Sequence, residues 1–133
     1  MLSAVSHGCP FCAPEAGRVF LERPLVVGLW DLYPVTERHA LLVTRRHVAT
    51  WFDASDDERA ALVAALPEVI AEIESRRAVE GYNVGFNAGE AAGQTVPHLH
   101  VHVIPRSRGD MSDPAGGVRH VIPWKGNYPR GAP

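Results

Sequence analysis

Residues 98–102 read His-Leu-His-Val-His, and this alternation constrains the fold more than any other feature of the chain. Side chains two residues apart in a β-strand point to the same side. The pattern therefore predicts a strand over His98–Ile104, ended by Pro105, with three imidazoles on one face. Packing does not explain three polar rings at this spacing, so that face is expected to meet solvent, a metal or a substrate. The aliphatic residues expected to enter the core from the other face are Leu99, Val101 and Val103.

One long helix is expected after residue 54. Ser55 and Glu58 have the spacing of a capping box, in which each side chain accepts a backbone N–H of the other residue. Apolar residues then recur at helical spacing up to Ile73. Pro67 predicts a kink or a break, because proline removes a helical hydrogen bond. The last turns are expected to carry Arg76 and Arg77, and Gly81 is a plausible stop.

Four more strands are expected, and most of the strands follow one another directly along the chain. This order favours an α+β fold with an antiparallel sheet of about five strands and one long helix. The segments concerned are Arg18–Glu22, Leu25–Trp30, His39–Thr44 and Tyr82–Phe86.

The size and charge of the chain exclude several classes of protein. Its 133 residues fit a single domain over 1–133, with a core at about 9–105 and a loop-rich tail over 106–133. A formal charge of −2 argues against a nucleic-acid-binding protein. The sequence has no apolar run near the roughly 20 residues that span a bilayer, and no secretory signal is visible in residues 1–12. A cytoplasmic protein with no membrane partner is expected.

The histidine run is compatible with two kinds of chemistry. All three imidazoles could bind one metal ion that activates water. Alternatively, one neutral imidazole could attack phosphorus as a nucleophile while its neighbours hold phosphate oxygens. The glycine-rich loop over 87–95 lies just upstream and would let backbone N–H groups approach an anion. This loop favours the phosphate chemistry.

The two cysteines of the chain form a C-x-x-C motif, Cys9-Pro10-Phe11-Cys12. Such a pair is found in redox sites and in zinc sites, and it can also have no shared role. A thioredoxin-like site needs a helix that begins at the pair, whereas Pro14 and Gly17 follow here. A closed zinc site would need two more ligands.

The stretch over 92–106, AGQTVPHLHVHVIPR, resembles the signature of the histidine-triad (HIT) family. Upstream, Pro34 and the segment from His39 to His47 resemble that family's strand between two histidines. The resemblance spans roughly residues 9–105. The chain has Arg38 where the family often has glycine, and Thr44 where it often has proline.

The resemblance implies a nucleotidyl hydrolase or transferase. His100 would attack the α-phosphate and form a covalent nucleotidyl-histidine, which water or another acceptor then releases as a nucleoside monophosphate such as AMP. Dinucleoside polyphosphates and nucleoside phosphoramidates are the expected substrates. The AGQTV run favours the fragile-histidine-triad type, which acts on dinucleoside polyphosphates. A nucleotide-binding regulatory protein with little turnover is the alternative. The other implied site residues are His102, His39 and Gln94 in catalysis, and Asp31, Asn87, Gly93 and Thr95 in substrate binding.

The resemblance also implies a structural Zn²⁺ and a homodimer. Some family members bind zinc through a C-x-x-C, a histidine after the third strand and the first histidine of the triad. The matching residues here are Cys9, Cys12, His47 and His98.

Overall fold

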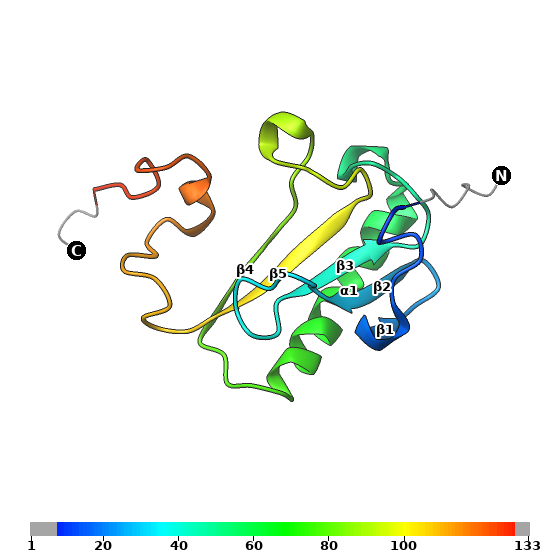
Figure 1. Cartoon of the computed structure of the whole chain (residues 1–133), viewed down its shortest axis with the longest axis horizontal. Coiled ribbons are helices and arrows are strands. Elements are labelled where there is room, and N and C mark those ends of the chain that lie inside the picture. The colour runs from blue at the N-terminus through cyan, green and yellow to red at the C-terminus, as the bar shows by residue number, and fades with distance from the viewer. Residues whose placement is uncertain (1–7, 130–133) are drawn as a thin grey trace.

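The computed structural model describes residues 8–129, and its centre is one antiparallel sheet with the strand order β1-β2-β3-β5-β4. A single α-helix, α1, packs against this sheet (Figure 1). The expected α+β architecture of five strands and one helix is therefore confirmed. The strands are β1 (Val19–Glu22), β2 (Val26–Trp30), β3 (Ala40–Thr44), β4 (Gly81–Gly85) and β5 (His100–Arg106), and α1 is Asp56–Glu74. Short 3₁₀ helices are η1 (Ala16–Arg18), η2 (Trp51–Asp53), η3 (Glu90–Ala92) and η4 (Gly117–Val121).

Apolar side chains cover both faces of the middle of the sheet. On one face α1 packs residues such as Leu62 and Val69 against the strands. On the other face Phe11, from the N-terminal loop, completes a second apolar cluster. Because β3 is buried on both faces, its sequence is apolar from Ala40 to Val43 instead of alternating. This second cluster consists of Phe11, Val27, Leu29, Leu41 and Val43.

The helix α1 begins as the sequence predicts but is not broken by Pro67. The capping box is present, with Ser55 Oγ accepting from Glu58 N and the Glu58 carboxylate accepting from Ser55 N. Pro67 lacks the N–H that would bond to the carbonyl of Val63. Val63 is 62% exposed, so water can solvate that carbonyl and the helix continues.

The end of α1 differs from the prediction. The helix stops at Glu74, so Arg76 and Arg77 lie beyond it. Arg77 instead donates to the carbonyl of Glu37 and to Ser107 Oγ, which ties three loops together. Gly81 does not stop the helix but is the first residue of β4. Arg76 pairs with Glu72 one turn earlier, whereas the distant partners of Arg77 are ones that the helical pattern does not reveal.

The strand β5 begins two residues later than expected and runs through Pro105. At its start, the backbone N–H of Leu99 donates to the carbonyl of Val48, a loop residue, so Leu99 lies outside the ladder. At its end, Pro105 pairs only with Tyr82 of β4, because the pairing with β3 stops at Ala40. Because no strand lies on the other side of Pro105, no neighbouring strand on that side needs an N–H from this residue. The other predicted strands differ from the observed ones by a single residue at one end or both.

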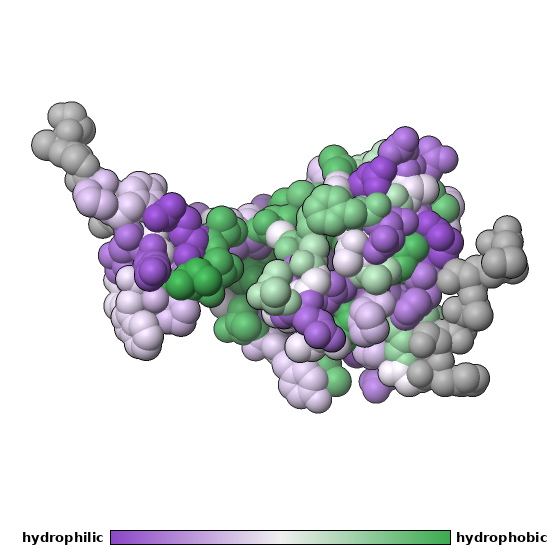
Figure 2. Space-filling view, turned by 90° about the horizontal axis from the view of Figure 1, so that it is seen from above, coloured by the Kyte–Doolittle hydropathy of each residue, from purple (hydrophilic) through white to green (hydrophobic). Residues whose placement is uncertain are grey.

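After β5 the chain forms a tail that extends away from the sheet (Figure 1). Seen from above, it is a second, smaller lobe joined to the main body by a narrow neck (Figure 2). Within residues 8–129, none of the helices has the length and apolar character needed to cross a membrane. The prediction that residues 1–12 carry no secretory signal falls mostly on residues 1–7, which lie outside the described part of the chain.

Candidate active site and metal cluster

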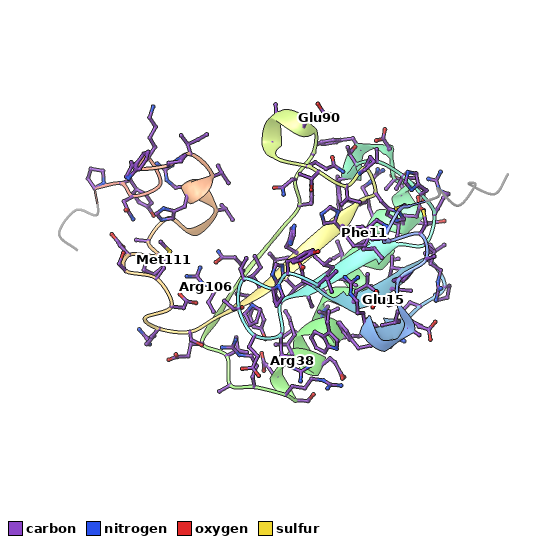
Figure 3. All side chains as sticks on the ribbon, viewed as in Figure 1. Phe11, Glu15, Arg38, Glu90, Arg106 and Met111 are labelled. Atoms are coloured by element: carbon purple, nitrogen blue, oxygen red, sulfur yellow. The ribbon has the colours of Figure 1, made fainter. Side chains whose placement is uncertain are left out.

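His100 and His102 lie next to each other on the face of β5 that carries Phe11. Their ring centroids are 5.2 Å apart, and the Phe11 ring lies 4.8 Å from that of His100. Phe11 is seen over the middle of the sheet in Figure 3. Val101 and Val103 point to the helix-side core, as the alternation predicts. His100 is largely buried, whereas a quarter of the His102 side chain is exposed.

One hydrogen bond fixes the tautomer of the neutral His100 ring. Its Nδ1 lies 2.8 Å from the carbonyl oxygen of His98. A carbonyl only accepts, so Nδ1 carries the ring proton of the neutral imidazole. The lone pair is therefore on Nε2, the ring nitrogen that can act as a nucleophile.

Beside this pair, His39, His102 and Asp31 form a second group of polar side chains. His39 Nε2 is 2.9 Å from His102 Nδ1 and 3.3 Å from a carboxylate oxygen of Asp31. Burial, together with the neighbouring His100 and His39, lowers the pKa of His102 to about 4, while Asp31 opposes the shift. Burial also lowers the pKa of His39. Both rings are thus held neutral near pH 7.

Most of the predicted substrate-contacting residues meet in one cavity of about 340 Å³. A second cavity of about 430 Å³ adjoins it and shares Asn87 and His102 with it. His39 lines the second cavity. The predicted residues that line the first one are His100, His102, Asp31, Asn87, Gly93 and Thr95.

Gln94 is the predicted catalytic residue that lines neither cavity. Its amide nitrogen donates to the carbonyls of Ala49 and Val96, and its amide oxygen accepts from the N–H of Gly89. These three bonds hold the glycine-rich loop together. In the same loop, Gly93 has φ +93°, a left-handed conformation that favours glycine.

Sequence reasoning missed seven further residues of the first cavity, which are Pro10, Phe11, Arg18, Leu32, Tyr33, Leu41 and Val96. Phe11 lies inside the C-x-x-C motif, and Arg18, whose Nε donates to the carbonyl of Trp30, is the basic side chain among the lining residues. Leu32 and Tyr33 also line the cavity and follow Asp31 directly. Their position next to Asp31 was the one signal that could have indicated them.

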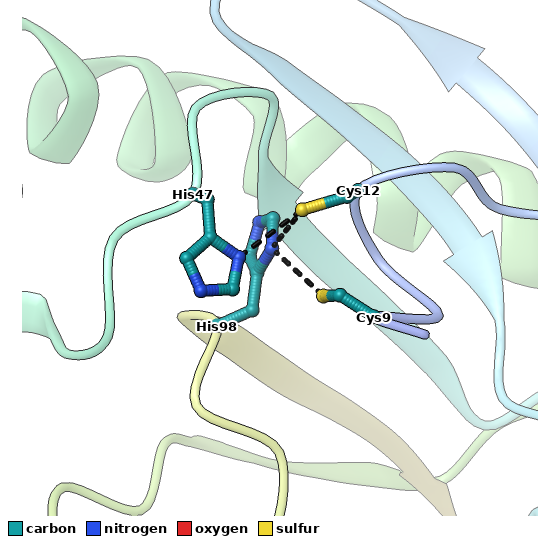
Figure 4. Close-up of side chains that lie close together, drawn as sticks. All are labelled: Cys9, Cys12, His47 and His98. Carbon is teal, nitrogen blue, oxygen red and sulfur yellow. Dashed lines mark hydrogen bonds between the residues drawn. The ribbon is translucent and has the colours of Figure 1, made fainter. Parts of the chain in front are cut away.

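The two cysteines meet His47 and His98 in a separate cluster (Figure 4). Cys9 Sγ is 3.4 Å from His98 Nδ1, and Cys12 Sγ is 3.1 Å from His47 Nδ1. All four potential ligand atoms lie within 4.8 Å of one another. Around a tetrahedral zinc ion, a sulfur and a nitrogen ligand are about 3.5 Å apart. The geometry of this cluster therefore fits a zinc ion.

A hydrogen bond to Thr44 orients the ring of His98 toward this cluster. Its Nε2 lies 2.7 Å from the carbonyl oxygen of Thr44, so Nε2 carries the proton and Nδ1 offers its lone pair to the cluster. The ring of His98 is thus separated from those of His100 and His102. The alternative in which all three bind one metal ion is not supported by this arrangement.

The sequence model of the protein family described as "HIT domain" matches residues 15–109 of this chain. The chain belongs to the HIT family. Among its relatives, "AP-4-A phosphorylase" of Mycobacterium tuberculosis is 38% identical over 104 residues, which are 77% of this chain and 53% of the relative. "Bis(5'-nucleosyl)-tetraphosphatase [asymmetrical]" of Schizosaccharomyces pombe is 34% identical over 100 residues, which are 75% of this chain and 55% of the relative. This HIT chain thus spans about half the length of these two curated relatives.

Solved structures of HIT proteins share the fold. A HIT family protein from Bacillus anthracis superposes with a TM-score of 0.72 at 29% identity, covering 78% of this chain and 77% of that one. The NitFhit protein of Caenorhabditis elegans superposes with a TM-score of 0.69 at 35% identity, covering 72% of this chain and 23% of that one. The HIT domain itself is therefore the part that these proteins have in common.

Proposed function

We propose that this HIT domain is a nucleotidyl hydrolase or transferase that cleaves nucleoside phosphate derivatives at the α-phosphate. The observation that carries the proposal is the 2.8 Å hydrogen bond from His100 Nδ1 to the His98 carbonyl, which leaves the lone pair on Nε2 of a residue that lines the 340 Å³ cavity. Relatives named for the phosphorolysis and hydrolysis of dinucleoside tetraphosphates support the substrate class.

The reaction has two steps. In the first, His100 Nε2 attacks the α-phosphorus, and the bond between phosphorus and the leaving group breaks as the N–P bond forms. His102 donates a hydrogen bond to a non-bridging oxygen, where negative charge increases in the transition state. In the second step, water attacks phosphorus, releases the nucleoside monophosphate and restores His100. Inorganic phosphate in place of water would give a nucleoside diphosphate instead.

The remaining cavity residues suit the rest of the nucleotide. The Asp31 carboxylate is a suitable acceptor for ribose hydroxyls, and Asn87 offers an amide to ribose or phosphate. The loop residues Gly93 and Thr95 present small polar groups to the phosphate. Gln94 supports the reaction by holding this loop, since its own side chain bonds to the loop backbone. Dinucleoside polyphosphates and nucleoside phosphoramidates are the substrates we propose.

We also propose that Cys9, Cys12, His47 and His98 bind a structural Zn²⁺. Two sulfur and two nitrogen donors close a tetrahedral site, which leaves no position for an activated water. When bound, the ion supplies binding free energy that holds the N-terminal loop, with Phe11, against the sheet. Metal binding needs both thiols reduced, which agrees with a cytoplasmic protein.

We infer that the protein forms a homodimer. Strand β4 is at the edge of the sheet, so one side of its backbone has no neighbouring strand within the described residues. Val63 on α1 and Val118 and Val121 on η4 are more than 60% exposed, and Figure 2 shows apolar surface where the tail faces the main body. Sedimentation is expected to give twice the 14.5 kDa chain mass; a monomer at micromolar concentration would contradict the inference.

A substrate panel tests the function directly. Diadenosine triphosphate, diadenosine tetraphosphate and an AMP phosphoramidate are incubated with the protein, and the products are separated by chromatography. We expect AMP to be released from at least one of them and the intact mass to increase by one nucleotidyl group in a rapid quench. Binding of AMP without turnover of any of the three would instead indicate a nucleotide-binding regulatory protein.

A further inference from the structure

Asp31, His39 and His102 place three donor atoms close together, and two explanations compete for them. Two histidines and one carboxylate are a common set of metal ligands. The same set can instead be a chain of hydrogen bonds. The contact on the far side of the His39 ring decides between them.

That contact is a backbone hydrogen bond. The N–H of Val35 donates to His39 Nδ1 at 3.1 Å. Nδ1 therefore holds a lone pair, and the proton of neutral His39 is on Nε2. A metal ion needs the lone pair on Nε2, which would move the proton to Nδ1 and set it against the Val35 N–H. The arrangement thus disfavours a metal ion and favours a hydrogen-bond chain.

The proton on His39 Nε2 has two acceptors, the Asp31 carboxylate at 3.3 Å and His102 Nδ1 at 2.9 Å. Because His102 Nδ1 accepts, the proton of neutral His102 is on its Nε2. His102 lines both cavities, so this N–H is available to a phosphate oxygen. The other carboxylate oxygen of Asp31 accepts from the Tyr33 N–H at 2.8 Å, which fixes the carboxylate in place.

We propose that Asp31 positions the catalytic His102 through His39, in addition to binding ribose. This inference rests on the proposed function. Asp31 and Val35 hold His39 with its proton on Nε2, and His39 in turn holds His102 as a donor toward the phosphate. One carboxylate thereby serves both the recognition of the sugar and the chemistry at phosphorus.

Asp31→Asn separates the two roles. The asparagine side chain has one acceptor oxygen, whereas the Tyr33 N–H and the His39 Nε2–H both need an acceptor at this position. Wild type and Asp31→Asn are each assayed with AMP phosphoramidate and with its 2′,3′-dideoxy analogue. The four rates form a double-mutant cycle. If Asp31 only binds ribose, the substitution leaves kcat for the dideoxy analogue unchanged. We expect that kcat to fall at least about tenfold, since a hydrogen-bond donor to the phosphate is misplaced.

Two further measurements distinguish positioning from general disruption. His39→Gln keeps an amide N–H near the place of Nε2–H and is expected to retain more of the wild-type kcat than His39→Ala. Nitrogen-15 NMR of the wild-type imidazoles reports the tautomers without any variant or turnover. We expect His39 and His102 both to be protonated on Nε2; an Nδ1–H form of either ring overturns the inference. Failure of the wild type to cleave the phosphoramidate would count against the proposed function. The NMR measurement of the tautomers would still test this inference.

Discussion

Replacing His100 with asparagine is expected to reduce turnover at least about a thousand-fold. The asparagine amide nitrogen takes the approximate place of His100 Nδ1, so it can still donate to the carbonyl of His98. The atom that is lost is Nε2, which the proposed reaction uses as the nucleophile. Steady-state release of AMP gives the rate, and intact mass after a rapid quench shows whether the nucleotidyl adduct still forms.

The same variant separates nucleophilic catalysis from metal catalysis. We expect His100→Asn to keep the metal content and the melting temperature of the wild type, because His100 is not part of the cysteine cluster. AMP binding is expected to stay within a few-fold of the wild type. A variant that retains turnover, or one that loses its metal together with its activity, would refute His100 as the nucleophile.

Replacing Cys12 with serine is expected to lower the free energy of unfolding by about 3 kcal/mol or more in zinc-containing buffer. Serine is a poor ligand at neutral pH, and the three remaining side chains do not close a tetrahedral site. Loss of the ion also releases the N-terminal loop, and with it Phe11, from its apolar cluster. Chemical denaturation gives the free energy, and elemental analysis gives the metal content.

Metal-stripped protein is the matched control for this prediction. In the absence of metal, wild type and Cys12→Ser are expected to have nearly equal stability, because the two side chains are similar in size. A cost of the substitution that is the same with and without zinc would argue against a metal site. Recovery of the wild-type protein with a disulfide between Cys9 and Cys12 and no metal would favour the redox interpretation.

The features that local physics determines were predicted from the sequence. The alternation of imidazole and aliphatic residues gave β5 and the two faces of that strand, and the pair Ser55 and Glu58 gave the start of α1. Both depend on residues within a few positions of one another. The fold class followed, since strands joined by short connections pair in an antiparallel sheet.

The features that depend on distant partners were not predicted. His98 belongs to the alternating run, but Val48 holds the backbone of Leu99 and Thr44 holds the ring of His98, so the strand starts later. Gln94 was expected in the site, and its bonds to the Ala49 carbonyl and to its own loop were not foreseeable. Arg18 lines the cavity with its Nε bonded to the carbonyl of Trp30, which is twelve residues away in the sequence. No local pattern contains this information.

His98 takes part in both the cysteine cluster and the nucleophilic site, through different atoms. Its ring faces the sulfurs, and its carbonyl oxygen accepts a hydrogen bond from Nδ1 of His100, two residues later. The distance between the two centres is therefore fixed by a single dipeptide and not by the packing of two elements. An insertion between His98 and His100 would separate the nucleophile from its acceptor. In this protein the two-residue spacing of His98 and His100 sets the distance between the cysteine cluster and the nucleophile.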